Sequence, residues 1–108
     1  MRTLTRKEEL VLLAIINLKD KAYLIAIFDY LTEVIGEKLS LTSVHLPLSR
    51  LEKNGLISSK LGGATAERGG RRKKFYRISD LGWEVLEEHK RINDRLWAEA
   101  AGVFPPKE

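Results

Sequence analysis

The hydrophobic period of this chain changes once, at Gly55, and this change restricts the fold more than any other feature. Before Gly55, apolar residues recur at intervals of three and four, the spacing of amphipathic helices. After it, residues 56–61 and 74–78 have the character of two short strands joined by a glycine-bearing loop. A long helical segment then follows. The predicted order is helix, helix, helix, strand, strand, helix.

Polar caps and glycines mark the ends of the predicted helices. Thr5 and Glu8 have the spacing of a capping box. The first helix then runs to Leu18, the second ends at Gly36, the third runs from the cap Ser40 to Asn54 and Gly55, and the fourth runs from the cap Ser79 to about Ala101.

The same spacing predicts which side chains face the core. They are Leu10, Leu13 and Ala14, with Val11 and Leu18 as further candidates, in the first helix; Leu24, Ile27, Phe28, Leu31 and Val34 or Ile35 in the second; and Val44, Leu48 and Leu51 in the third. Tyr76 and Ile78 are expected to pack against the helices from the second strand.

This order predicts a mainly α (α+β) fold, a winged helix-turn-helix. It has three helices, a two-stranded wing and a long C-terminal dimerisation helix of about 30 Å. We expect residues 1–78 to form the winged helix-turn-helix domain, residues 79–102 the long C-terminal helix, and residues 103–108 a tail. A βαβ arrangement is excluded because no apolar strand precedes the helices.

The composition of the chain argues against several functional classes. The 108 residues allow one modest core, and there is no cysteine for a disulfide, a thiolate metal site or a nucleophile. The apolar run 10–16 is far shorter than the roughly 20 residues that span a bilayer. With two separated histidines and no nucleophile-base set, we expect no catalysis, no metal and no cofactor. A cytoplasmic protein that binds no membrane is expected.

Positive charge is concentrated in one place. Six of the nineteen basic residues lie between Arg68 and Arg77, so the net charge of +4 is a local feature of the glycine-rich loop. Such a cluster suits a phosphate backbone. The alternative is a loop that is basic for solubility, which is common for an isolated charge run.

Two segments together resemble the PadR-like family of transcriptional regulators. One is residues 39–57, which contain Arg50-Leu51-Glu52 and Gly55-Leu56, and the other is residues 69–82, which begin Gly-Gly-Arg-Arg. The resemblance extends from Glu9 to about Leu96. It implies a winged helix-turn-helix fold, a recognition helix, a DNA-binding wing and a dimerisation helix.

The chain departs from the family pattern at three positions. Leu24 stands where the family often has glycine, and His45 where it often has tyrosine. Pro47 lies one residue later than the usual helix proline. Since a proline inside a helix costs about 3 kcal/mol, we expect a kink or irregular turn near residues 43–47.

The candidate DNA-binding residues fall into two groups. Those of the recognition helix are Thr42, Ser43, His45, Ser49, Arg50 and Lys53. Those of the wing are Arg71, Arg72, Lys73 and Lys74. An ordinary polar helix face is the alternative for the first group, and Arg50 could equally pair with Glu52 or a neighbouring acid.

The fourth helix carries more apolar surface than one small domain can cover, which implies a second copy. The candidate dimer residues are Leu81, Val85, His89, Ile92, Leu96 and Trp97, with Trp83 and Leu86 adding apolar surface elsewhere on the helix. Trp97 could instead stack a planar ligand at a dimer centre, but a small-molecule effector has no other support in the sequence.

These features predict a sequence-specific DNA-binding transcriptional regulator. We expect a repressor that acts as a homodimer on double-stranded DNA with a pseudo-palindromic operator. The alternative is a winged-helix protein-protein adaptor that does not bind DNA and uses the long apolar helix.

Overall fold

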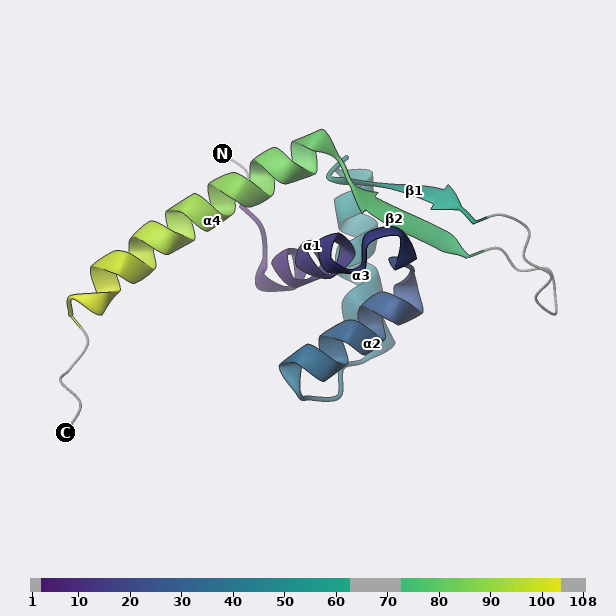
Figure 1. The fold of residues 1–108 in the computed structure, drawn as a ribbon, viewed down its shortest axis with the longest axis horizontal. Coiled ribbons are helices and arrows are strands. Elements are labelled where there is room, and N and C mark those ends of the chain that lie inside the picture. The colour runs from purple at the N-terminus through teal and green to yellow at the C-terminus, as the bar shows by residue number, and fades with distance from the viewer. Residues whose placement is uncertain (1–2, 63–72, 104–108) are drawn as a thin grey trace.

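The computed structural model describes residues 3–62 and 73–103 and confirms the predicted winged helix with a long C-terminal helix (Figure 1). Its elements are α1 (Arg6–Leu18), the short 3-10 helix η1 (Lys19–Lys21), α2 (Leu24–Ile35), α3 (Leu41–Lys53), β1 (Ile57–Leu61), β2 (Lys74–Ile78) and α4 (Asp80–Ala101).

The predicted caps are present. The Thr5 hydroxyl accepts a hydrogen bond from the Glu8 amide at 3.1 Å, and the Glu8 carboxylate accepts one from the Thr5 amide at 2.8 Å. Ser40 and Ser79 cap α3 and α4 in the same way. Gly36 ends α2 with a φ of +77°, a left-handed conformation that favours glycine. Each helix therefore begins or ends where the sequence places a suitable residue.

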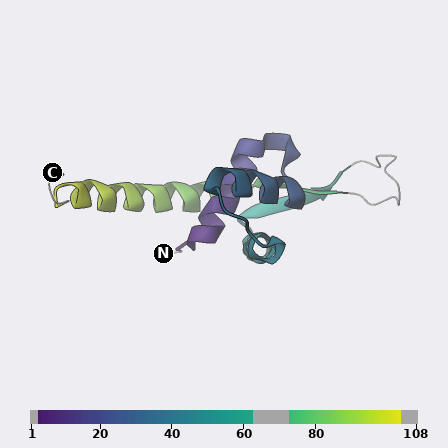
Figure 2. The ribbon, with the colours of Figure 1, turned by 90° about the horizontal axis from the view of Figure 1, so that it is seen from below.

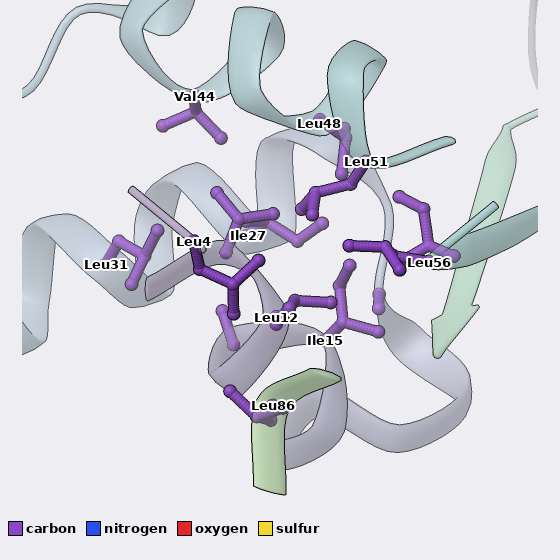
Figure 3. Packing of buried hydrophobic residues seen from close by; sticks show 14 residues of the cluster. Leu4, Leu12, Ile15, Ile27, Leu31, Val44, Leu48, Leu51, Leu56 and Leu86 are labelled. Carbon is purple, nitrogen blue, oxygen red and sulfur yellow. The ribbon is translucent and has the colours of Figure 1, made fainter. Parts of the chain in front are cut away.

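One hydrophobic core joins all four long helices to the hairpin. Figure 3 shows Leu12 and Ile15 of α1 between Ile27 of α2, Leu56 before β1 and Leu86 of α4. The core residues predicted on α3 are confirmed: Val44, Leu48 and Leu51 are buried.

The predicted inner face of α1 is partly wrong. Leu13 is 40% exposed, whereas Leu12 and Ile15 are buried. The apolar run 10–16 fits more than one helical face, so spacing alone did not select the buried one. On α2, Val34 is 62% exposed, and Ile35 packs against the core instead.

Pro47 does not interrupt α3. The helix is continuous from Leu41 to Lys53, so of the two expected alternatives, a kink or an irregular turn, the irregular turn is wrong. Proline removes one amide donor from a helix at a cost of about 3 kcal/mol. Here the Pro47 ring is fully buried, and this packing offsets part of the cost.

The two strands form an antiparallel hairpin in which Ile57 pairs with Ile78 and Leu61 with Lys74. Tyr76 and Ile78 pack against the core, as predicted. The free edge of β2 is held by the segment before α2, because the Tyr76 amide donates to the Ala22 carbonyl at 2.8 Å.

The first turns of α4 belong to the core, and the rest extends away from it. Leu86 is 7% exposed, so its predicted place on outer apolar surface is wrong. A Cβ added at Gly82 would lie 2.1 Å from the Leu56 carbonyl oxygen, which shows how closely α4 approaches the chain before β1. In Figures 1 and 2, the hairpin and the far end of α4 project in opposite directions.

Candidate nucleic-acid interface

The outer face of α3 is polar and exposed along its whole length. Its exposed residues are Thr42, His45, Leu46, Ser49, Arg50 and Lys53. Leu46 was not among the predicted site residues, although its spacing from Thr42, Ser49 and Lys53 assigns it to the same face. This leucine is 52% exposed in the middle of the polar face.

Ser43 differs from the other predicted residues of this helix because its groups serve the N-terminal cap. Its amide donates to the Ser40 hydroxyl at 3.1 Å, and its own hydroxyl donates to the Ser40 carbonyl at 2.6 Å. The side chain is partly buried. In this arrangement the Ser43 hydroxyl donates its proton to the Ser40 carbonyl at the start of the helix.

Arg50 pairs with a neighbouring acid, and Glu52 is not its partner. Its Nε atom lies 3.8 Å from Oε2 of Glu8, in the first turn of α1. The Arg50 side chain remains 53% exposed. The guanidinium is therefore available at the surface but oriented by the acid at the start of α1.

Lys74 is held by α3. Its Nζ donates to Oε1 of Glu52 at 2.9 Å, and the second Glu52 oxygen accepts a hydrogen bond from the Ser59 hydroxyl. The bonds from Ser59 and then Lys74 hold the pKa of Glu52 below its usual value. The bond to Glu52 raises the pKa of Lys74. Burial raises the pKa of Tyr76, whose ring lies under the Lys74 ammonium.

Of the other predicted wing residues, Lys73 lies directly before β2. Its Nζ is 4.4 Å from the centre of the Tyr23 ring, and that ring meets Phe75 edge-on with 5.6 Å between ring centres. Arg71 and Arg72 lie outside the described residues. The end of the hairpin away from Ile57 and Ile78 is thus fixed to the start of α2 through contacts with the Tyr23 ring.

The predicted dimer residues form two groups on α4. Leu81, Leu96 and Trp97 are exposed, with Leu96 at 59% and Trp97 at 60%. Val85, His89 and Ile92 are partly buried. In this single chain, Nε2 of His89 lies 3.4 Å from Oε2 of Glu9, so His89 joins α4 to α1.

An open groove of about 650 Å³ lies along the hairpin. It is lined by the last turn of α1, by both strands and by Trp83 of α4. Ile16, Leu61 and Trp83 contribute apolar surface to it. This groove and the exposed end of α4 are separate apolar surfaces of the same chain.

No helix within residues 3–62 and 73–103 is long and apolar enough to cross a membrane. In the same residues, no group of three or more histidine, cysteine, aspartate or glutamate side chains could hold a metal ion.

The fold and this exposed helix face define a winged helix-turn-helix protein. Solved structures with the same architecture include a PadR-like transcriptional regulator from Bacillus cereus, with 25% identity and a TM-score of 0.73 over 93% of this chain and 92% of that one. A PadR family transcriptional regulator from Eggerthella lenta is 25% identical, with a TM-score of 0.72 over 94% of this chain and 87% of that chain.

A third, a PadR family transcription regulator from Clostridium difficile, is 26% identical, with a TM-score of 0.61 over 89% of this chain and 92% of that one. No protein-family model and no curated protein sequence matches the chain. The structural neighbours confirm the PadR-like character that residues 39–57 and 69–82 indicated.

Proposed function

We propose that this protein is a sequence-specific DNA-binding transcriptional regulator that acts as a homodimeric repressor. The observation that carries the proposal is the exposed polar face of α3 beside a basic wing. The PadR-like neighbours are transcriptional regulators, which supports the same class. Access to DNA implies a cytoplasmic location.

In this proposal, α3 enters the major groove. Thr42, His45 and Ser49 carry groups that can donate to or accept from base edges. Leu46 offers the apolar contact that suits a thymine methyl group. Lys53, in the last turn of the helix, would contact phosphate, and such contacts fix orientation without reading sequence.

The wing would bind the DNA backbone. Arg71, Arg72 and Lys73 lie close together in sequence, and like charges so close repel one another unless an anion is present. Lys74 would contribute less, because its ammonium is already paired with Glu52.

Residues 79–102 would form the dimer, and residues 1–78 the DNA-binding domain. Leu96 and Trp97 are exposed beyond the part of α4 that packs on the core. Antiparallel packing of two α4 helices would bring these residues towards Trp83 and the groove of the partner. A two-fold dimer then predicts a pseudo-palindromic operator, with half-sites about one helical turn, 10 bp, apart or a multiple of it.

Duplex binding across a salt series tests the proposal. Fragments selected from genomic DNA by the wild type serve as the specific site, and random duplex as the non-specific one. An Arg71→Gln, Arg72→Gln, Lys73→Gln variant should lower the magnitude of the log-affinity against log-salt slope by about 0.9 per lost phosphate contact. Unchanged affinity and slope in a folded variant would exclude the wing from DNA binding.

Repression is tested separately with a reporter gene behind the selected fragment. Expression should fall when the protein is produced and recover with the wing variant. An increase in expression would make the protein an activator, with DNA binding unaffected.

A protein-protein adaptor is the second candidate, and one observation favours it. Leu96, Trp97 and the apolar groove offer surface for a partner protein without any role for DNA. The adaptor function predicts no salt-dependent binding of any duplex. The same salt series therefore separates the two functions.

A further inference from the structure

We propose that Glu52 is a positioning residue that sets the angle between the wing and the recognition helix. The inference rests on the proposed DNA-binding function. Glu52 lies in the last turns of α3, and its carboxylate reaches both strands of the hairpin. One oxygen accepts from Lys74 Nζ at 2.9 Å, and the other accepts from the Ser59 hydroxyl.

Both partners of Glu52 lie beyond the first residue pair of the hairpin, in a part that also contacts the segment before α2. At the base, Ile57 and Ile78 pair with each other and pack among the core residues. Ser59 is in the middle of β1, and Lys74 is the first residue of β2. Lys74 is also two residues from Arg72 in the sequence. Glu52 therefore contacts the hairpin on the side of its basic segment.

The length of the strands makes their angle important. A strand of five residues is about 17 Å long. Rotating it by about 10° at its base would displace its far end by about 3 Å, the length of a hydrogen bond. Wing contacts to phosphate and α3 contacts to bases can both form only when this angle is held.

Without a positioning role, an acid at residue 52 would only weaken the binding of DNA. The Glu52 side chain is 32% exposed and belongs to the helix that would enter the groove. A negative charge there repels phosphate, so electrostatics alone predicts that Glu52→Gln binds duplex more tightly. Positioning predicts the opposite sign, because the neutral amide leaves Lys74 without its ionic partner.

The experiment compares Glu52→Gln with the wild type in binding a selected duplex across a salt series. We expect about fivefold weaker binding near 0.1 M salt. The slope should fall in magnitude by about 0.9 for each phosphate contact that the wing loses. Glu33→Gln is the control for loss of one negative charge, since Glu33 is an exposed acid near the end of α2, a helix that carries none of the proposed DNA-binding or dimer residues. It should leave the slope unchanged.

Two further variants separate positioning from charge. Ser59→Ala removes one hydrogen bond to Glu52 without changing any charge, and it should also weaken binding. Lys74→Gln should cost as much as Glu52→Gln, and the double variant no more than either, because the two residues act as one unit. Additive losses would mean that Lys74 binds phosphate by itself and would overturn the inference.

The outcomes distinguish this inference from the function on which it rests. If the wild type binds no duplex in a salt-dependent way, the proposed function fails. If the wild type binds, but folded Glu52→Gln binds equally well or more tightly, only the positioning role fails. Thermal melts of each variant establish that the protein measured is folded.

Discussion

Nε of Arg50 on α3 lies 3.8 Å from Oε2 of Glu8 in the first turn of α1. The other oxygen of the same carboxylate accepts a hydrogen bond from the Thr5 amide at 2.8 Å. One acid thus closes the capping box of α1 and orients a cation on α3. Substitution can separate these two roles, because glutamine keeps the acceptor and loses the charge.

Glu8→Gln should lower the free energy of unfolding by less than about 1 kcal/mol, since the pair is 3.8 Å long and its Arg50 side chain is half-exposed. Glu8→Ala should cost about 1 kcal/mol more, because it also removes the reciprocal bond of the capping box. Urea denaturation measures both. Equal losses for the two variants would show that the charge matters and the cap does not.

Gly82→Ala should destabilise the protein by about 2 kcal/mol or more, as overpacking does in a tight contact. The added Cβ would lie 2.1 Å from the Leu56 carbonyl oxygen, which belongs to the backbone and cannot rotate away. Gly102→Ala is the control, since its Cβ would have no neighbour closer than 3.6 Å and its φ is −76°. That variant should change stability by under about 0.5 kcal/mol. Similar melting curves for both would refute the close approach of α4.

Local features of the fold were predictable because they depend on neighbouring residues. Thr5, Ser40 and Ser79 cap helices through side chains that bond three residues ahead, so sequence alone locates them. The inner face of α1 was not predictable, because a continuous apolar run has no clear period. The burial of Leu86 was not predictable either, because it depends on how α4 crosses the core and not on the spacing of apolar residues in α4.

The candidate site was predicted as a set of exposed residues but not as a set of contacts. The period of α3 gave the face that carries Thr42 and Ser49 correctly. The partners of Arg50 and Lys74 are 42 and 22 residues away in the chain, at Glu8 and Glu52. Such pairs follow from the packing of helices and hairpin, and no local pattern encodes them.

The stability of the protein should depend on pH through Glu52. The bonds from Ser59 and Lys74 lower the folded-state pKa of Glu52 below its ordinary value of 4.5. Its contribution is therefore present above about pH 4.5 and is lost as the pH falls through the folded-state pKa. The difference in unfolding free energy between wild type and Glu52→Gln should be under about 1 kcal/mol near neutrality and shrink in acid. A difference that grows on acidification would contradict the assigned interaction.

Removal of the outer half of α4 should give a folded monomer. A chain ending at Lys90 keeps Leu86 in the core and the His89 contact with Glu9, but lacks Leu96 and Trp97. Sedimentation should show a monomer for this chain and a dimer for the full one, while circular dichroism should show that the shortened chain folds. A shortened chain that remains dimeric would assign the interface to another surface, such as the groove beside Trp83.

Ser49 and Lys53 should make different contacts with DNA, Ser49 to bases and Lys53 to phosphate. Both are exposed on one face of α3, but Ser49 lies towards the middle and Lys53 is the last helical residue. A hydroxyl deep in a groove can distinguish bases, whereas an ammonium at the helix end reaches phosphate. Lys53→Ala should weaken selected and random duplexes by the same factor and reduce the salt slope by about 0.9 per contact.

Ser49→Ala should act differently, with about fivefold weaker binding of the selected duplex and little change on random duplex, because only the base contact is lost. Its salt slope should match that of the wild type. The measurement is a competition between the two duplexes at several salt concentrations. Equal losses on both duplexes for Ser49→Ala would remove Ser49 from base reading and leave Thr42, His45 and Leu46 as the residues of α3 that distinguish sequence.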